Sequence, residues 1–375
     1  MMTEQSYHPE LVRFAFVIGV VVSVLFYERF QLTTGGIAAP GYLAFGLFEP
    51  LILPGLFMVA FATHAIVHRG LAHLALMPAA GQFSLLILVS AMLHFLLELL
   101  LIRYAGFTPS SQVLRGIGYV IPGLVAHDFA RHGIARTIGS VSITTLVVAL
   151  ALAVVLLALP ETGRLRTSPV EDRMAIALQH MPMLILISLI AWLGLVRQHD
   201  LRCGGFLGGA YLSLLVIQPS ELARFATAIF ATLFIVKYLL PRVTILFGRR
   251  RFAAHLLVGA CLYWAIVRLS ELHFSGETVS VVTPSLAVVG ILLTGLLSRD
   301  MDVAGVMRTL LGSALSVSFS LAGTLLLVET LTHQRLHVAA PLLTILLAGG
   351  LLMATSPANV RRIWFQLVGK APSEP

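Results

Sequence analysis

Charged residues are scarce in this chain of 375 residues: only 11% are Asp, Glu, Lys or Arg. A soluble globular domain carries roughly a quarter charged residues, so this composition excludes a soluble protein of that length. Hydrophobic residues make up 58% of the chain, and long apolar runs follow one another without the alternating pattern of a β-barrel. The sequence therefore predicts an all-α, polytopic transmembrane helical bundle.

Cysteine is nearly absent as well. Cys203 and Cys261 are the two in the chain, which excludes a disulfide framework and a zinc site. His64, His68 and His73 follow one another closely, but no carboxylate or cysteine joins them, so we expect no metal site. The GxxxxGK[ST] phosphate loop is also missing, and nothing in the sequence indicates ATP or another cofactor.

Positive charge exceeds negative charge, with 25 Lys and Arg against 17 Asp and Glu. Positive loops that face the cytoplasm of a membrane protein produce such an excess, although an anionic partner or substrate would also fit it. The sequence has no aromatic-rich basic face, so we expect no nucleic acid partner. The densest basic cluster, 237–252, should be cytoplasmic.

The apolar runs predict about 11 to 13 membrane segments. The N-terminus is acidic and no small-residue cleavage site follows the first run, so we expect a retained first helix. We expect the first membrane repeat over 1–159, an inter-repeat loop over 160–179, the second repeat over 180–330, and an extra C-terminal helix with a basic tail over 331–375. The expected segments are 11–27, 36–48, 51–67, 83–102, a bent stretch 115–140, 137–159, 181–196, 205–217, 222–240, 252–269, 279–298, 305–328 and 338–354.

The two halves of the chain align with each other. Chance matching of leucine-rich helices is the alternative, but the matches include glycine, tyrosine, proline and threonine, which favours a duplication. With a shift of 169 positions, Gly35, Gly36, Tyr42 and Pro50 fall on Gly204, Gly205, Tyr211 and Pro219; with a shift of 172, Gly123, Asp128, Gly133 and Arg136 fall on Gly295, Asp300, Gly305 and Arg308.

One segment in each half, 36–48 and 205–217, is too short to span as a straight helix, which needs roughly 20 residues. Glycines interrupt both, and Pro40 interrupts the first as well. If both segments cross the membrane, the repeats are parallel, which we favour; if both re-enter, the repeats are inverted.

Three stretches resemble one family. They are YERFQLTTGGIAAPGYLAFGLFEP (27–50), GRRRFAAHLLVGA (248–260) and RGIGYVIPGLVAHDFARHGIARTIGS (115–140), and they look like the three motifs of the PgsC/CapC family. That family is the small membrane subunit of the poly-γ-glutamate capsule synthase. Its usual member is about half as long as this chain, so the chain resembles a fused tandem pair.

The resemblance implies an inner-membrane, multi-pass subunit of a bacterium that acts in making and exporting an anionic polymer. It implies a cytoplasmic Mur-ligase-like PgsB/CapB subunit, which activates carboxylates with ATP, and an extracytoplasmic PgsA/CapA-like subunit. The chain itself would be a non-catalytic subunit that anchors the ligase and passes the polymer outward. An autonomous secondary transporter of an anionic small molecule and a non-conducting scaffold are the alternatives.

The candidate polymer- or partner-binding residues lie in those three stretches. Arginine pairs with carboxylates through two parallel hydrogen bonds, but the same arginines could anchor the chain to lipid headgroups, and Asp128 could instead cap the next helix. The candidates are Glu28, Arg29, Pro40, Gly41, Tyr42, Arg115, Pro122, Gly123, His127, Asp128, Arg131, Arg136, Arg249, Arg250 and Arg251.

His94 and Glu98 are four residues apart on one face of an apolar segment. A proton relay is one interpretation, and a structural interhelical pair is the favoured one.

Each half has kept different parts of the family pattern. The Glu28–Arg29 pair of the first half reads Arg197–Gln198 in the second, whereas the basic GRRRF stretch of the second half reads AAGQF in the first. The two halves together therefore resemble one working unit.

Overall fold

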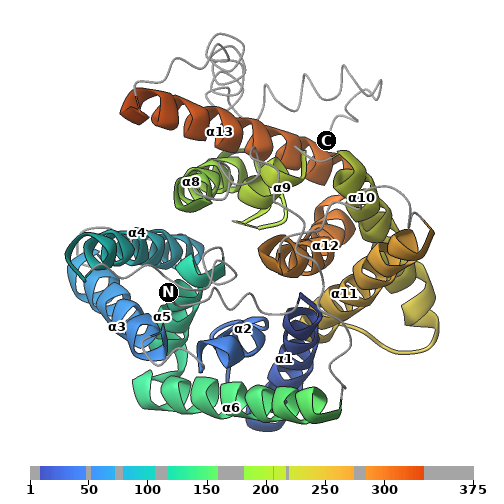
Figure 1. The fold of residues 1–375 in the computed structure, drawn as a ribbon, viewed down its shortest axis with the longest axis horizontal. Helices are drawn as coiled ribbons and strands as arrows, with labels where there is room; N and C mark the ends of the chain where they lie inside the picture. The colour runs from blue at the N-terminus through green and yellow to red at the C-terminus, as the bar shows by residue number, and fades with distance from the viewer. Residues whose placement is uncertain are drawn as a thin grey trace, which may run out of the picture. The chain divides into compact units, whose positions relative to one another are not determined.

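The computed structural model describes residues 9–47, 52–71, 79–105, 117–158, 181–205, 207–216, 219–273 and 284–332. Every regular element within these ranges is a helix, which confirms the all-α prediction (Figure 1). The inter-repeat loop 160–179 and the predicted last helix 338–354 lie outside the described residues.

The first half contains six α-helices, a π-helical turn and a short 3₁₀ turn within the described residues. Glycine and proline separate several of these elements, as the sequence predicts. In chain order they are α1 (Pro9–Phe30), α2 (Ala39–Gly46), α3 (Ile52–Ala65), the π-helical turn η1 (Ile66–Leu71), α4 (Ala79–Ala105), η3 (Ile117–Tyr119), α5 (Ile121–His132) and α6 (Ile134–Ala158).

The second half repeats this order. Its π-helical turn even begins at the equivalent residue, since Ile66 and Ile235 are 169 positions apart. The elements are α8 (Met181–His199), α9 (Gly208–Val216), α10 (Pro219–Phe234), η4 (Ile235–Leu239), η5 (Leu240–Arg242), α11 (Gly248–His273), α12 (Pro284–Ala304) and α13 (Val306–Thr332). The matching order confirms the internal repeat.

Four helical stretches of the described residues are long and apolar enough to cross a membrane. These are Ile134–Val154, Pro219–Arg242, Gly248–Ser270 and Val306–Thr324. In contrast, α2 and α9 have eight and nine residues, too few to span a bilayer. The expected short, interrupted segment is therefore present in both halves.

The chain divides into two compact units that do not coincide with the repeats. Unit 1 comprises Met1–Pro182 and Ser220–Ser298, and unit 2 comprises Met183–Pro219 and Arg299–Pro375. In unit 1, α2 packs on α1 and α6, while α5 packs on α3 and α4. In unit 2, α9 packs on α13. Helices α10 and α11 of the second half thus belong to the same unit as the first half.

Glycines let helix backbones touch in unit 1. A Cβ on Gly41 of α2 would overlap the backbone oxygen of Ala15 in α1, and a Cβ on Gly19 would overlap the backbone of Gly41. Close crossings of this kind between membrane helices require small residues. The glycine of the proline–glycine step at the start of α2 therefore allows this short helix to pack directly against the backbone of α1.

Replacing Gly41 with Ala should destabilise unit 1 by about 1–3 kcal/mol, because the added methyl group meets rigid backbone rather than a movable side chain. The measurement is the thermal unfolding midpoint of the detergent-solubilised chain. Gly139→Ala in α6 is the matched control: its Cβ meets nothing within 4 Å, so the midpoint should stay or rise. Equal midpoints for the two variants would contradict the close crossing.

Candidate functional site

The break between α1 and α2 is a loop with left-handed backbone at three positions. Gln31, Gly35 and Gly36 have φ of 56°, 71° and 105°. Glycine adopts such angles without the penalty that a Cβ brings, which explains the Gly-Gly pair in the sequence. The loop lets the chain leave α1 and start a second helix after only eight intervening residues.

The break between α8 and α9 has the same backbone. Asp200, Gly204 and Gly205 have φ of 51°, 77° and 74°, and each lies 169 positions after its counterpart in the first loop. The 27–50 and 196–219 stretches thus share one local fold within their described residues.

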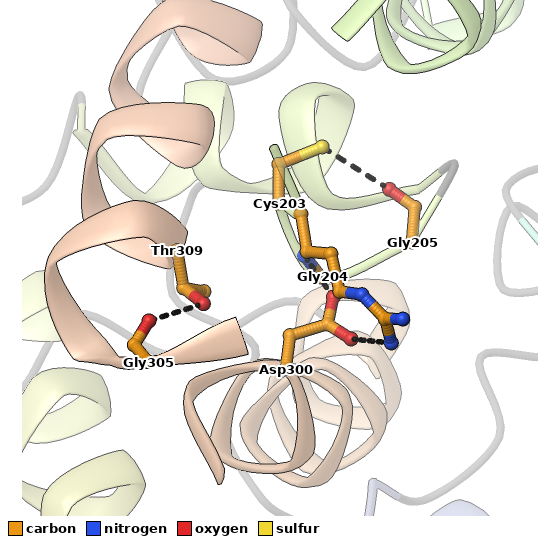
Figure 2. A network of polar contacts seen from close by, with 7 residues as sticks. Cys203, Gly204, Gly205, Asp300, Gly305 and Thr309 are labelled. Atoms are coloured by element: carbon orange, nitrogen blue, oxygen red, sulfur yellow. Dashed lines mark hydrogen bonds and ion pairs between the residues drawn. The ribbon is translucent and has the colours of Figure 1, made fainter. Parts of the chain in front are cut away.

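A buried aspartate holds each loop. The Asp128 carboxylate of α5 accepts the Gly35 N–H at 2.9 Å, and the Asp300 carboxylate of α12 accepts the Gly204 N–H at 3.0 Å (Figure 2). Both aspartates are buried, where an unsatisfied backbone N–H would be costly. Asp128 therefore pairs with a loop 93 residues away, and the interpretation that it caps the next helix is wrong.

Each of these aspartates lies just before a glycine bend. Gly133 separates α5 from α6 with φ of 87°, and Gly305 separates α12 from α13 with φ of 92°. The next helix begins with the same threonine contact, from Thr137 Oγ1 to the Gly133 oxygen at 2.9 Å and from Thr309 Oγ1 to the Gly305 oxygen at 3.0 Å. Loop, aspartate and bend form one motif, present twice.

The two copies differ in the groups around the aspartate. In the second copy the Arg202 guanidinium lies 3.8 Å from the Asp300 carboxylate, whereas threonine, Thr33, stands at the equivalent position of the first copy. There, Ser140 Oγ of α6 donates to the Thr33 carbonyl at 2.8 Å instead. A charged group supports the second loop and a hydroxyl group supports the first.

A second polar site joins α1 to the start of α11 in unit 1. Arg250 Nε donates to the Glu28 carboxylate at 2.6 Å, and the Arg249 guanidinium lies 3.9 Å from the centre of the Tyr27 ring. Stacking on an aromatic face and pairing with a carboxylate are both favourable for guanidinium. The parts of the family pattern that each half has kept are therefore in direct contact.

Further arginines lie at the same end of unit 1. The α1–α2 loop contacts Asp128 near the end of α5 and Ser140 near the start of α6, so the α5–α6 junction lies beside the end of α1. We call this the basic end and define it by six residues. They are Arg29, Arg131, Arg136, Arg249, Arg250 and Arg251, of which Arg251 and Arg249 are half-buried and the others exposed.

The family model for "Capsule biosynthesis CapC" matches the chain twice, over residues 18–138 and 185–310. These matches cover more than half of the chain, one in each repeat. The chain belongs to the CapC capsule biosynthesis family. It is similar to the "PGA biosynthesis protein CapC" of Bacillus subtilis (strain 168), with 27% identity over 126 residues, which are 34% of this chain and 83% of that protein.

The "Capsule biosynthesis protein CapC" of Bacillus anthracis is similar to the same extent, with 29% identity over 126 residues and the same two coverages. No solved structure matches the chain. Since 83% of either Bacillus protein corresponds to only a third of this chain, a single repeat is nearly a whole CapC relative.

Several predicted site residues of this CapC-family chain are packing residues. Pro40, Gly41 and Tyr42 are buried in the contact of α2 with its neighbours. Pro122 and Gly123 are also buried, and a Cβ on the latter would approach the backbone of α4. These residues allow α2 and α5 to pack closely on neighbouring helices, while Arg115 lies outside the described residues.

The predicted histidines pack against aromatic rings. The His127 ring packs edge-on against Phe83, with 5.1 Å between centroids. Burial lowers the pKa of His127 although the Asp128 carboxylate raises it, so this ring adds no positive charge to the basic end at neutral pH. His94 packs edge-on against Tyr119 at 4.9 Å. The side chain of Glu98 lies outside the described residues, and the proton relay stays a prediction.

Sequence reasoning missed a buried charged cluster at the opposite end of α1. Arg13 is 3% exposed, and Glu221 of α10 is 1% exposed. Glu221 accepts a hydrogen bond from Arg224 at 2.5 Å, and Glu221, Arg13 and Arg224 each interact electrostatically with the Tyr263 hydroxyl of α11. Three charged residues in apolar runs were the available signal, because such groups in membrane helices face the bundle interior.

Removing the loop-holding carboxylate should destabilise either copy. Asp128→Ala and Asp300→Ala each leave a buried Gly N–H without its acceptor, which costs about 1–3 kcal/mol. Asn keeps an oxygen acceptor, so Asp128→Asn and Asp300→Asn should lose less. The measurement is the thermal midpoint in detergent together with protease sensitivity of the loop. If Ala and Asn variants lose stability equally, the hydrogen bond is not what holds the loop.

Proposed function

We propose that the chain is the integral inner-membrane subunit of a bacterial complex that makes and exports capsular poly-γ-glutamate or a related anionic polymer. Its basic end faces the cytoplasm, because positive residues flanking membrane helices stay on that side. There it anchors an ATP-dependent, Mur-ligase-like subunit and receives the growing polymer. A CapA-like subunit acts on the outer side. Membership of the CapC family supports this role.

The observation that carries the proposal is the convergence of arginines from four helices at the basic end. Arg29 ends α1, Arg131 and Arg136 flank the α5–α6 bend, and the 249–251 run opens α11. A γ-linked glutamate polymer has one free carboxylate in each unit, and guanidinium groups bind carboxylates through paired hydrogen bonds. Exposed arginines at several positions suit a ligand that repeats its charge.

An apolar loop beside the basic end supports partner anchoring. Val243, Ile245 and Phe247 are 85%, 72% and 71% exposed, and they lead directly into the arginine run of α11. Exposed apolar groups rimmed by charge mark protein or membrane contacts. We assign this loop to the ligase subunit because the α10 and α11 stretches that flank it are both candidate membrane spans, which bring it to the surface of the bilayer.

Arg131→Ala combined with Arg136→Ala should reduce polymer output at least tenfold while the chain still assembles in the membrane. Both side chains are exposed, so their loss removes carboxylate contacts without opening the core. The measurement is secreted polymer per cell, normalised to the amount of the membrane subunit.

The matched control replaces the same two arginines with Lys. Lys keeps the positive charge that lipid headgroups require, but it lacks the planar fork that binds a carboxylate bidentately. We expect the Lys variant to show an intermediate loss. Normal output from both the Ala and the Lys variants would refute polymer contact at these residues.

A secondary transporter is the second candidate function, and the two interrupted helix pairs favour it. Discontinuous helices in each of two repeated halves are typical of carriers, and α2 and α9 both follow such a break. Reconstituted vesicles without any ligase separate the two functions. Flux of glutamate or of short γ-linked glutamate oligomers in these vesicles would favour the carrier, and its absence together with ligase recruitment would favour the synthase subunit.

A further inference from the structure

Helix α1 of the first repeat lies against helix α11 of the second repeat within unit 1. Phe14 and Trp264 pack edge-on with 4.8 Å between ring centroids. At the other end of α1, Arg249 stacks on Tyr27, and its neighbour Arg250 binds Glu28. We call this contact the α1–α11 seam.

The seam has one continuous antiparallel register. From Phe14 to Glu28 the residue number rises along α1, while the contacted residue falls from Trp264 to Arg250 along α11. Fourteen residues of helix correspond to about 21 Å. Two helices that keep one register over this length form an extended interface rather than a single crossing.

Helix α11 is the second-repeat equivalent of α4. Gly295 of α12 approaches the backbone of Leu256 in α11, just as Gly123 of α5 approaches the backbone of Ile87 in α4. In a CapC relative with one repeat, the equivalents of α1 and α11 that form this seam would belong to two different copies of the protein. The seam therefore joins two helices that would come from separate subunits in a one-repeat protein.

We infer that the α1–α11 seam is a subunit interface that the duplication has made intramolecular, so that the two halves of the chain bind each other without their covalent link. The Glu28–Arg250 pair fixes the register of this interface. This inference does not depend on the polymer or the ligase.

The residues equivalent to Glu28 and Arg250 cannot form the same ion pair. Glu28 corresponds to Arg197, and Arg250 corresponds to Gly81. Arginine and glycine side chains cannot pair as a carboxylate and a guanidinium do. The chain therefore carries this charged pair, which fixes the register, at one of the two equivalent contacts.

The test uses the full chain with a protease site inserted between α6 and α8, cleaved after purification in mild detergent. A tag on the second half captures it, and the retained first half is measured while SDS is added stepwise. We expect wild-type halves to stay together in mild detergent. The variants are compared at the SDS concentration at which half of the wild-type first half remains bound to the captured second half. There, at least fivefold less first half should remain bound in Glu28→Arg and in Arg250→Glu.

Combining Glu28→Arg with Arg250→Glu exchanges the charges and should restore retention to within twofold of wild type. Arg197→Glu is the matched control, because it changes charge at the diverged equivalent position, and it should behave as wild type. Separation of wild-type halves upon cleavage, wild-type behaviour of both single variants, or failure of the exchange to restore retention would each overturn the inference.

The cleaved wild type is also titrated in high salt, which tests the charged pair without any substitution. Salt screens an exposed ion pair strongly, with a Debye length of about 3 Å at 1 M. We expect retention at the half-point SDS concentration to fall at least twofold between 0.15 and 1 M salt. Salt-independent retention would overturn the role of the charged pair.

Discussion

A hydrogen bond between a buried carboxylate and a glycine N–H is the constraint on which each repeat depends. The α1–α2 loop exposes backbone groups in the interior of a helical bundle, where no water can satisfy them. Asp128 supplies the acceptor in the first repeat and Asp300 in the second. Because each aspartate lies just before a glycine bend, the same bond fixes both the interrupted helix and the junction with the helix that follows the bend.

The arginines of the basic end are positioned by this constraint. The loop that Asp128 holds also receives the Ser140 hydroxyl, and the α5–α6 junction is thereby brought beside the end of α1. Arg131 and Arg136 then lie at the same end of unit 1 as the Glu28–Arg250 pair. The arginines of the basic end come from distant positions in the sequence, and their placement thus depends on one buried hydrogen bond to the backbone.

The sequence predicted the repeat architecture closely, because the glycine, aspartate and threonine positions that define it recur at constant shifts. The segment expected over 252–269 corresponds to α11, which begins four residues earlier at Gly248 and so includes the arginine run. The partner of Asp128 could not be predicted, since the Gly35 N–H is 93 residues away and local rules favour a helix cap. The buried cluster of Arg13 and Glu221 could not be predicted for the same reason. The sequence shows that both residues are charged, but it does not show which residues of the two repeats lie together.

Joining two repeats in one polypeptide has a consequence for symmetry. Two identical copies of a one-repeat protein would have to use the same residue at both equivalent positions, so any change would appear twice. In this chain Arg250 and Gly81 occupy equivalent positions. The basic run is therefore present in one repeat, whereas two identical copies of a one-repeat protein would carry it twice. Each polypeptide therefore offers one such surface, which limits the stoichiometry of whatever binds there to one per chain.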